Sequence, residues 1–142
     1  MMTTLLLTMF VPILLAGADP APKPPEIIYV KFGEIKVNGE TFKKDIVIEN
    51  GKVKKRKKGK SKDQKAKYGH TPLTPLEKTI PWDCKTLVIG TGKYGRLPIV
   101  DEFKEEAKKR GVKLVILKMK EAVKYYLDNF APDINAIFHI TC

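Results

Sequence analysis

Residues 86–100 read Thr-Leu-Val-Ile-Gly-Thr-Gly-Lys-Tyr-Gly-Arg-Leu-Pro-Ile-Val. The apolar run Leu87–Ile89 predicts a buried strand, and the G-x-G-x-x-G spacing from Gly90 to Gly95 predicts a sharp turn at its end. A helical pattern then begins at Pro98. A buried strand that enters a glycine-rich turn and then a helix is where α/β proteins usually place a ligand. This stretch therefore indicates both the fold class and a candidate site.

The second half of the chain continues the α/β pattern on both sides of that turn. Around the strand at 85–89, the spacing of apolar residues predicts helices over 98–110 and 120–130. Continuous apolar runs predict further strands over 112–117 and 136–141. The order is β-α-β-α-β, which is typical of a sheet covered by helices.

The first half reads differently, as an antiparallel meander of three or four short strands within residues 27–53. Asn38-Gly39 and Asn50-Gly51 are strong hairpin turns between runs rich in β-branched residues. Downstream, Thr74–Glu77 has the form of a capping box and predicts a helix of one or two turns that ends before Pro81. We therefore expect an α/β domain with an antiparallel addition.

Residues 1–25 differ from the rest, and we treat them as an apolar extension with a proline-rich linker, followed by one domain over 26–142. Ala16-Gly17-Ala18 has the small-x-small form of a signal-peptidase site, but no Lys or Arg precedes Lys23. The apolar run is too short to span a bilayer. A cleaved signal, a tether and a mis-set start all remain open. We favour a cytoplasmic protein, with export after cleavage at Ala18 as the alternative.

The positive charge of the chain is concentrated in one segment. The net charge is +11, and residues 52–67 hold ten Lys or Arg and a single acid, Asp63. Such a run can bind phosphate groups or nucleic acid, but no aromatic side chain that could stack on a base occurs before Tyr68. We favour a solvated, mobile basic loop over 52–67 that can start as the outer edge of the last hairpin strand, where lysine discourages edge-to-edge pairing, and keep nucleic-acid binding as a less favoured alternative.

The glycine turn matches the spacing of a dinucleotide fingerprint, but two features argue against a bound dinucleotide. The helix pattern begins only at Pro98, and Lys118 follows the next strand where a ribose-binding acid belongs. We therefore expect no cofactor. A looser anion cradle from backbone N–H groups and nearby side chains fits better, although the glycines can equally serve tight packing. The candidate ligand-binding residues are Gly90, Thr91, Gly92, Tyr94, Gly95 and Arg96, with Lys93 nearby and His70 as a further member.

The histidines and cysteines give no specific motif. His70 lies in a proline-bounded loop, a favourable place for function, whereas His139 lies in a strand and fits a hydrogen-bonded core residue better. Cys84 could pair with His70, or Cys142 with His139, but nothing in the spacing shows that either pair meets. We assign no catalytic residue and expect no metal site, because these four side chains are too few and too loosely spaced.

With its segments placed, the sequence resembles a known family of small α/β domains. The matching pieces are Phe32–Gly39, Asp45–Ile48, Gly69-His70, Leu87–Gly92 and His139–Cys142. The family was first described in a methanogen protein of unknown function. It includes the animal adipogenesis-associated domain protein and the third mitochondrial complex I assembly factor.

The resemblance implies a single three-layer α/β domain with a mixed central sheet, flanking helices and an antiparallel hairpin layer. It brings no catalytic residues, and the eukaryotic members resemble assembly or regulatory partners. The leading functional prediction is a non-enzymatic domain that binds a protein partner or a small anion at Gly90–Gly95. The alternatives are an enzyme acting on a phosphorylated or carboxylated small molecule, and nucleic-acid binding through 52–67. The oligomeric state stays open.

Overall fold

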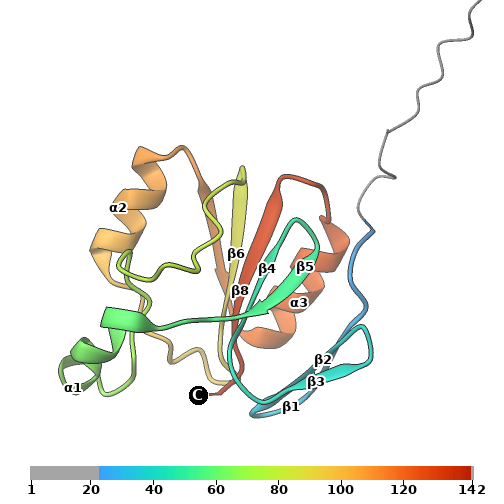
Figure 1. Ribbon diagram of the computed structural model, residues 1–142, viewed down its shortest axis with the longest axis horizontal. Helices are drawn as coiled ribbons and strands as arrows, with labels where there is room; N and C mark the ends of the chain where they lie inside the picture. The colour runs from blue at the N-terminus through green and yellow to red at the C-terminus, as the bar shows by residue number, and fades with distance from the viewer. Residues whose placement is uncertain (1–22, 142) are drawn as a thin grey trace, which may run out of the picture.

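The computed structural model describes residues 23–141, apart from the side chain of Val30. Two sheets and three α-helices make up an α/β fold, and Figure 1 shows their arrangement. The strands are β1 (Ile27–Lys31), β2 (Glu34–Val37), β3 (Glu40–Phe42), β4 (Ile46–Glu49), β5 (Lys52–Lys55), β6 (Thr86–Thr91), β7 (Lys113–Leu117) and β8 (Ile134–His139). The helices are the 3₁₀-helix η1 (Gly59–Gln64) and the α-helices α1 (Lys65–Tyr68), α2 (Asp101–Lys109) and α3 (Met119–Asp128).

The central sheet has five strands in the order β5-β4-β8-β6-β7. Strands β6, β7 and β8 run parallel, whereas β4 is antiparallel to both β8 and β5. Strands β1, β2 and β3 form a separate antiparallel sheet. The central sheet is therefore mixed, and β8 lies in its middle.

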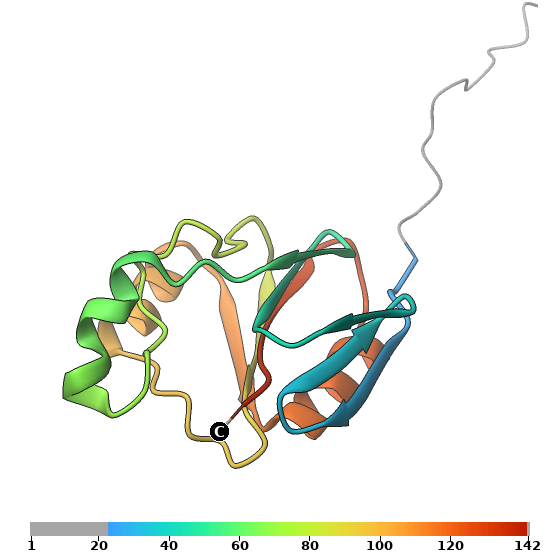
Figure 2. The ribbon, with the colours of Figure 1, turned by 60° about the horizontal axis from the view of Figure 1, so that its bottom comes forward.

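Side chains alternate between the two faces of the central sheet, which gives two apolar layers. On one face, Val88 and Phe138 pack with α3 and with β1 and β2. On the other, Leu87 and Ile137 pack with α2 and with the segment that precedes β6. Helix α3 and the small sheet thus cover one face while α2 covers the other, as Figures 1 and 2 show. The predicted three-layer α/β fold is confirmed.

The first half differs from the predicted meander in one respect. Strands β1 to β3 do form a meander, but the chain then leaves this sheet, and β4 pairs with β5 and β8 in the central sheet. Asn38 and Asn50 both have positive φ, as their hairpin turns require. The two turns were thus predicted correctly from the sequence, whereas the change of sheet between them was not.

The predicted short helix at 74–80 is wrong. This segment forms turns, because Leu73 donates its N–H to the carbonyl of Pro98 and accepts the N–H of Val100. The same pairing holds Pro98–Val100 extended, so helix α2 begins at Asp101, three residues after the predicted start. Asp101 and Glu102 then lie in the first helical turn, where the helix dipole favours negative charge.

The basic segment 52–67 starts as an edge strand, as expected, but its remainder is structured and is not a solvated loop. It forms the edge strand β5, η1 and the first part of α1, and Arg56 and Ser61 within it are buried. Figure 2 shows η1 and α1 on the same side of the sheet as α2. The remaining basic side chains are exposed or half-buried.

Some predictions lie outside the described residues. These are the signal, tether or mis-set start within 1–22 and the reactivity of Cys142. The domain boundary between residues 25 and 26 also stays a prediction. Over 23–141, no helix combines the length and apolar character needed to cross a bilayer.

Candidate functional site

Segments that are far apart in sequence end at one edge of the central sheet. Strand β4 begins at Ile46, which pairs with Lys55 at the end of β5 and with Phe138 near the end of β8. The residues at or just beyond these ends therefore lie close together, and they are Asp45, Arg56, His139 and Thr141. The parallel strands β6 and β8 have their carboxyl ends at this edge, which is where open α/β sheets bind ligands.

Arg56 is the centre of a buried ionic cluster at this edge. Its guanidinium donates to both carboxylate oxygens of Glu77, each at 2.7 Å, and to Asp45 Oδ2 at 2.9 Å. It also donates to the carbonyl of Pro72 at 3.1 Å. Burial by itself lowers the pKa of Arg56, but the hydrogen bond and charge of Glu77, together with Asp45, raise it above its ordinary value. Arg56 is therefore a fixed cation.

A hydroxyl pair completes the far side of the cluster. The Ser61 hydroxyl donates to Glu77 Oε2 at 2.8 Å and lies 2.7 Å from Thr74 Oγ1. Ser61 belongs to η1, so this contact fixes the basic helix to the segment before β6. The backbone of η1, which carries Lys62, is thereby held beside this end of the sheet.

Asp45 joins the ionic cluster to the end of β8. Its Oδ2 lies 2.7 Å from His139 Nδ1, and its Oδ1 accepts the backbone N–H of Ile140 at 3.2 Å. Lys58 Nζ lies 3.7 Å from Asp45 Oδ2. Burial by itself raises the pKa of Asp45, but the hydrogen bond and charge of His139, with Lys58 and Arg56, outweigh it and lower the pKa to about 2. Asp45 is therefore ionised at neutral pH.

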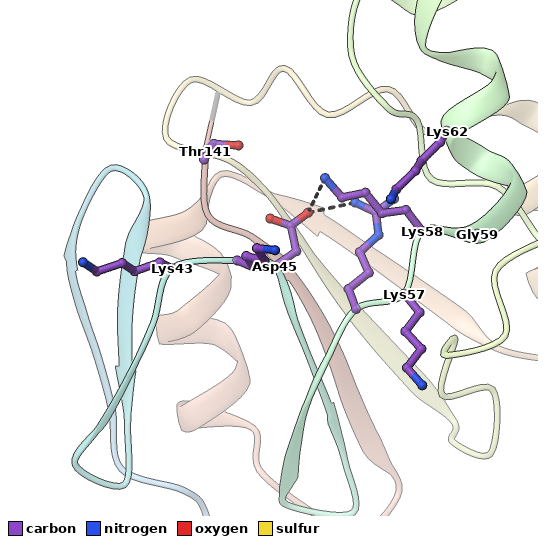
Figure 3. A pocket seen from close by; sticks show the side chains of 9 residues that line it. Lys43, Asp45, Lys57, Lys58, Gly59, Lys62 and Thr141 are labelled. Carbon is purple, nitrogen blue, oxygen red and sulfur yellow. Dashed lines mark hydrogen bonds and ion pairs between the residues drawn. The ribbon is translucent and has the colours of Figure 1, made fainter.

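A pocket of about 500 Å³ opens above this cluster. Its lining is strongly basic and consists of Lys43, Lys44, Asp45, Arg56, Lys57, Lys58, Gly59, Lys62 and Thr141. Figure 3 shows Lys58 and Lys62 reaching toward the Asp45 carboxylate, while Lys43 and Lys57 point away from it. We call this the basic pocket.

Charge is unevenly compensated in the basic pocket. Glu77 neutralises Arg56, and Asp45 faces Lys58. Within residues 23–141, the remaining four lysines of the lining, Lys43, Lys44, Lys57 and Lys62, form no ion pair. The pocket therefore carries an excess of positive charge and is electrostatically suited to an anion.

The glycine turn lies at the same edge but does not line the basic pocket. Much of its hydrogen bonding is internal, since Gly92 O accepts the N–H groups of Gly95 and Met119, each at 3.2 Å. Leu97 N–H donates to Thr91 O, and Thr91 Oγ1 donates to Leu117 O at 3.0 Å. These donor groups are already bonded within the protein and hold the turn together. An anion cradle made by the turn stays a prediction.

Gly90 has a packing role in the structure. A Cβ atom at this position would lie 2.4 Å from Met119 Sδ and 3.0 Å from the ring of Phe138. Glycine therefore lets helix α3 approach β6 closely. Gly95 has a φ of +71°, in the left-handed region that glycine adopts without strain.

Tyr94 and Arg96 lie on the surface of the glycine turn. Tyr94 is 57% exposed, and its ring centroid lies 6.4 Å from that of Phe32, which is also exposed. The cationic groups of Lys93 and Arg96 lie 5.5 and 5.7 Å from the Tyr94 ring centroid. This is a small aromatic and cationic surface patch on the turn.

The basic pocket brings together neither His70 nor the glycine turn. His70 follows α1 and is half-buried. Three other surface pockets of the described residues are lined by neither His70 nor residues 90–96. Cys84 lies in the loop before β6 and donates its S–H to Pro81 O at 3.3 Å. His139 is buried and bonded to Asp45, which agrees with the core interpretation given to it from sequence.

Four residues of this site, Asp45, Arg56, Glu77 and Thr141, are not predicted as site residues by the sequence pattern. One signal was available, because Arg56 is the only arginine among the ten basic residues of 52–67. Arginine is the residue that makes two parallel hydrogen bonds to a carboxylate, so its presence in a lysine run points to a specific acidic partner. Glu77 was assigned to a capping box instead.

Comparison with known proteins places the chain in a family. Residues 27–129 match the sequence profile of a family described as "Protein of unknown function (DUF498/DUF598)". The chain belongs to this family. No curated protein matches the sequence at a significant level.

Solved structures agree with the DUF498/DUF598 assignment. The conserved hypothetical protein PH1505 from Pyrococcus horikoshii is 34% identical, with a TM-score of 0.71 over 82% of this chain and 99% of that one. The protein MT938 is 22% identical, with a TM-score of 0.61 over 83% and 99%. A Mth938-like domain from Bordetella pertussis is 17% identical, with a TM-score of 0.55 over 87% and 90%.

These matches confirm the predicted resemblance to a small α/β domain family of unknown function. The more distant two show the fold alone. The link to the adipogenesis-associated protein and to the complex I assembly factor stays a prediction.

Proposed function

We propose that this DUF498/DUF598 domain binds a small, multiply charged anion in the basic pocket. The observation that carries the proposal is the excess of lysine around a pocket whose Arg56 and Lys58 already have acidic partners. A volume of about 500 Å³ fits a small molecule rather than a single ion. The position at the carboxyl ends of β6 and β8 supports the same conclusion.

Rigidity also favours a binding site. Ser61 anchors η1, and Asp45 and Arg56 are held by buried hydrogen bonds, so the edge of the pocket is organised before a ligand arrives. A site that is ordered in advance loses little conformational entropy on binding. Phosphate groups suit it best, because each offers several oxygens to ammonium donors.

Thermal denaturation with and without anions tests the proposal. We expect pyrophosphate, nucleotides or sugar phosphates at millimolar concentration to raise the melting temperature by several degrees, since ligands that bind only the folded state stabilise it. Added NaCl should weaken the shift by screening. The double variant K44Q/K62Q should lose most of the shift.

The matched control is Lys104→Gln, which removes an exposed lysine from α2, on a different part of the molecule. It should keep the full shift. If no phosphate-bearing compound raises the melting temperature of the wild-type domain, the proposal is wrong. A shift of equal size in K44Q/K62Q and Lys104→Gln would place the anion elsewhere.

A protein partner at the glycine turn is the second candidate function. Tyr94 and Phe32 favour it, because exposed aromatic side chains beside Arg96 have the composition of binding hot spots. The test is pull-down from the native host with wild-type domain and with the Tyr94→Ala variant. A partner retained equally by both would not use this surface.

A further inference from the structure

Three polar side chains connect the ionic cluster to the wall of the basic pocket. Asp45 Oδ2 lies 2.7 Å from His139 Nδ1, and His139 Nε2 lies 3.3 Å from Thr141 Oγ1. When the ring is neutral with its proton on Nδ1, that N–H donates to the Asp45 carboxylate, and Nε2 holds a lone pair that faces the Thr141 hydroxyl. The same order of carboxylate, imidazole and hydroxyl activates nucleophiles in hydrolases of unrelated fold.

Thr141 places its hydroxyl group on the wall of the basic pocket. It lines the basic pocket and is half-buried, whereas His139 is 4% exposed. In Figure 3 the Thr141 hydroxyl points toward the space that Lys58 and Lys62 also face. A ligand in the pocket therefore meets the hydroxyl and the two ammonium groups, while the imidazole lies behind them.

We propose that Thr141 is a nucleophile for the hydrolysis of a phosphate monoester bound in the basic pocket, with His139 as its general base. This rests on the proposed function, because the substrate's phosphate occupies the anion site. Asp45 keeps the imidazole in the tautomer that accepts the hydroxyl proton. Lys58 and Lys62 face the phosphate oxygens.

The reaction has two steps. Thr141 Oγ1 forms a bond to phosphorus as its proton passes to His139 Nε2, and the bond from phosphorus to the alcohol oxygen breaks. The alcohol oxygen departs on the side of phosphorus opposite Thr141 and takes a proton from the Lys62 ammonium group, which lines the pocket. Water then attacks the phosphothreonine from that side and gives a proton to the neutral Lys62 amine, and phosphate is released as the protonated His139 returns its proton to Thr141 Oγ1. One water is consumed, and one alcohol and one phosphate leave.

The lining favours phosphoryl over acyl transfer. An acyl-transfer site needs donors aimed at a single developing oxyanion, often backbone N–H groups. Here Ile140 N–H is already directed at Asp45 Oδ1. Phosphoryl transfer instead spreads negative charge over three equatorial oxygens, which several ammonium groups can share. The lysines of the basic pocket supply that arrangement.

Release of p-nitrophenol from p-nitrophenyl phosphate tests the chemistry, with pyrophosphate-induced thermal shift as the readout of binding. Wild-type protein should turn over the ester, and acid quenching should trap a phosphoryl group on Thr141, detected by peptide mass spectrometry. Thr141→Val keeps the shape without the hydroxyl and should lower the rate about 10²-fold or more. Thr141→Ser should retain both turnover and the trapped adduct.

His139→Gln should lose turnover and keep the pyrophosphate shift. If that buried change prevents folding, Thr141→Val decides alone. Lys104→Gln should leave both readouts unchanged. A wild-type protein that shows the shift but no turnover overturns this inference and leaves the proposed function standing. Turnover by the Thr141→Val variant would also overturn it. If pyrophosphate does not raise the melting temperature of the wild-type protein, both proposals are wrong.

Discussion

Arg56 shows how one buried cation can organise several segments. Its guanidinium makes four hydrogen bonds, to Asp45, to Pro72 O and to both oxygens of Glu77. The side chain is fully buried, so each of these bonds replaces hydration that the group has lost. A lysine has no planar fork and could not satisfy both acids in this geometry.

Replacing Arg56 should therefore lower the stability of the fold. We expect Arg56→Met to lower the free energy of unfolding by about 3–5 kcal/mol, because it leaves the buried Glu77 carboxylate without its cation and removes one of the partners of Asp45. Lys55→Met, one position earlier and exposed, should change it by less than about 1 kcal/mol. Urea denaturation of both variants measures the difference. Equal values for the two would mean that the cluster contributes little.

Asp45 should make stability depend on pH in the acid range. Its pKa is about 2 in the folded protein and 3.8 ordinarily, so the unfolded chain binds the proton more tightly. The contribution of Asp45 is then complete above about pH 4 and is lost as the pH falls toward the folded pKa, by about 2 kcal/mol. Denaturation of wild type and Asp45→Asn across this range should show the slope in wild type alone. Asp63→Asn, at an exposed acid, should keep the wild-type slope.

Cys84 should react slowly in the folded protein. Burial, helped by the charges of Asp83 and Asp133, raises the pKa of the thiol to about 11, although hydrogen bonds from Asn135 oppose the shift. At neutral pH the thiolate is then about a hundredfold scarcer than at the ordinary value. In a Cys142→Ser background, iodoacetamide should alkylate Cys84 far faster in urea than in native buffer. Equal rates would contradict the shift.

At the level of elements, the end of β6 is governed by packing. Gly90 of β6 faces helix α3 beside the Phe138 side chain of β8, and there is no room for a side chain at this position. The φ of Gly90 is not positive, so alanine would be limited by contact with its neighbours and not by backbone strain. The glycine spacing that resembles a dinucleotide fingerprint thus has a structural explanation at its first position.

Gly90→Ala should destabilise the domain by about 1–3 kcal/mol, because the new methyl group overpacks Met119 and Phe138. Met119→Ala makes a cavity and is costly by itself, but it also removes the sulfur that the methyl group meets. A double-mutant cycle should therefore show that Gly90→Ala costs less in the Met119→Ala background. If the two changes in stability simply add, the methyl group at position 90 is not limited by its contact with Met119.

The elements that could be predicted from sequence are those with local signals. Strands β6, β7 and β8 and helices α2 and α3 lie within a few residues of their expected places, since apolar periodicity and turn residues decide them. The helix expected at 74–80 failed because Leu73 bonds to residues of the 98–100 segment, a long-range contact that overrides a local capping pattern. The solvated loop at 52–67 failed for the same reason, through the buried partners of Arg56.

For the molecule as a whole, the basic pocket could not be read from sequence. Apart from the contact between His139 and Thr141, its polar contacts join residues 11 to 95 positions apart, for example Arg56 with Asp45 and Ile140 with Asp45. Only the pairing of β4 with both β5 and β8 brings these positions together. The sequence shows that most of the positive charge lies in residues 52–67. Only the fold shows that three lysines of this run, Lys57, Lys58 and Lys62, line one pocket.

The central place of β8 has a consequence for synthesis on the ribosome. The strand order leaves β5-β4 and β6-β7 as two ribbons that β8 alone joins. While residues 134–139 are still inside the exit tunnel, both ribbons expose an inner edge, and Asp45 has no imidazole beside it. Until β8 is paired, β4 and β6 each lack a partner strand on one side, and unpaired strand edges favour pairing with other chains. Pairing of β8 both closes the central sheet and brings His139 to Asp45.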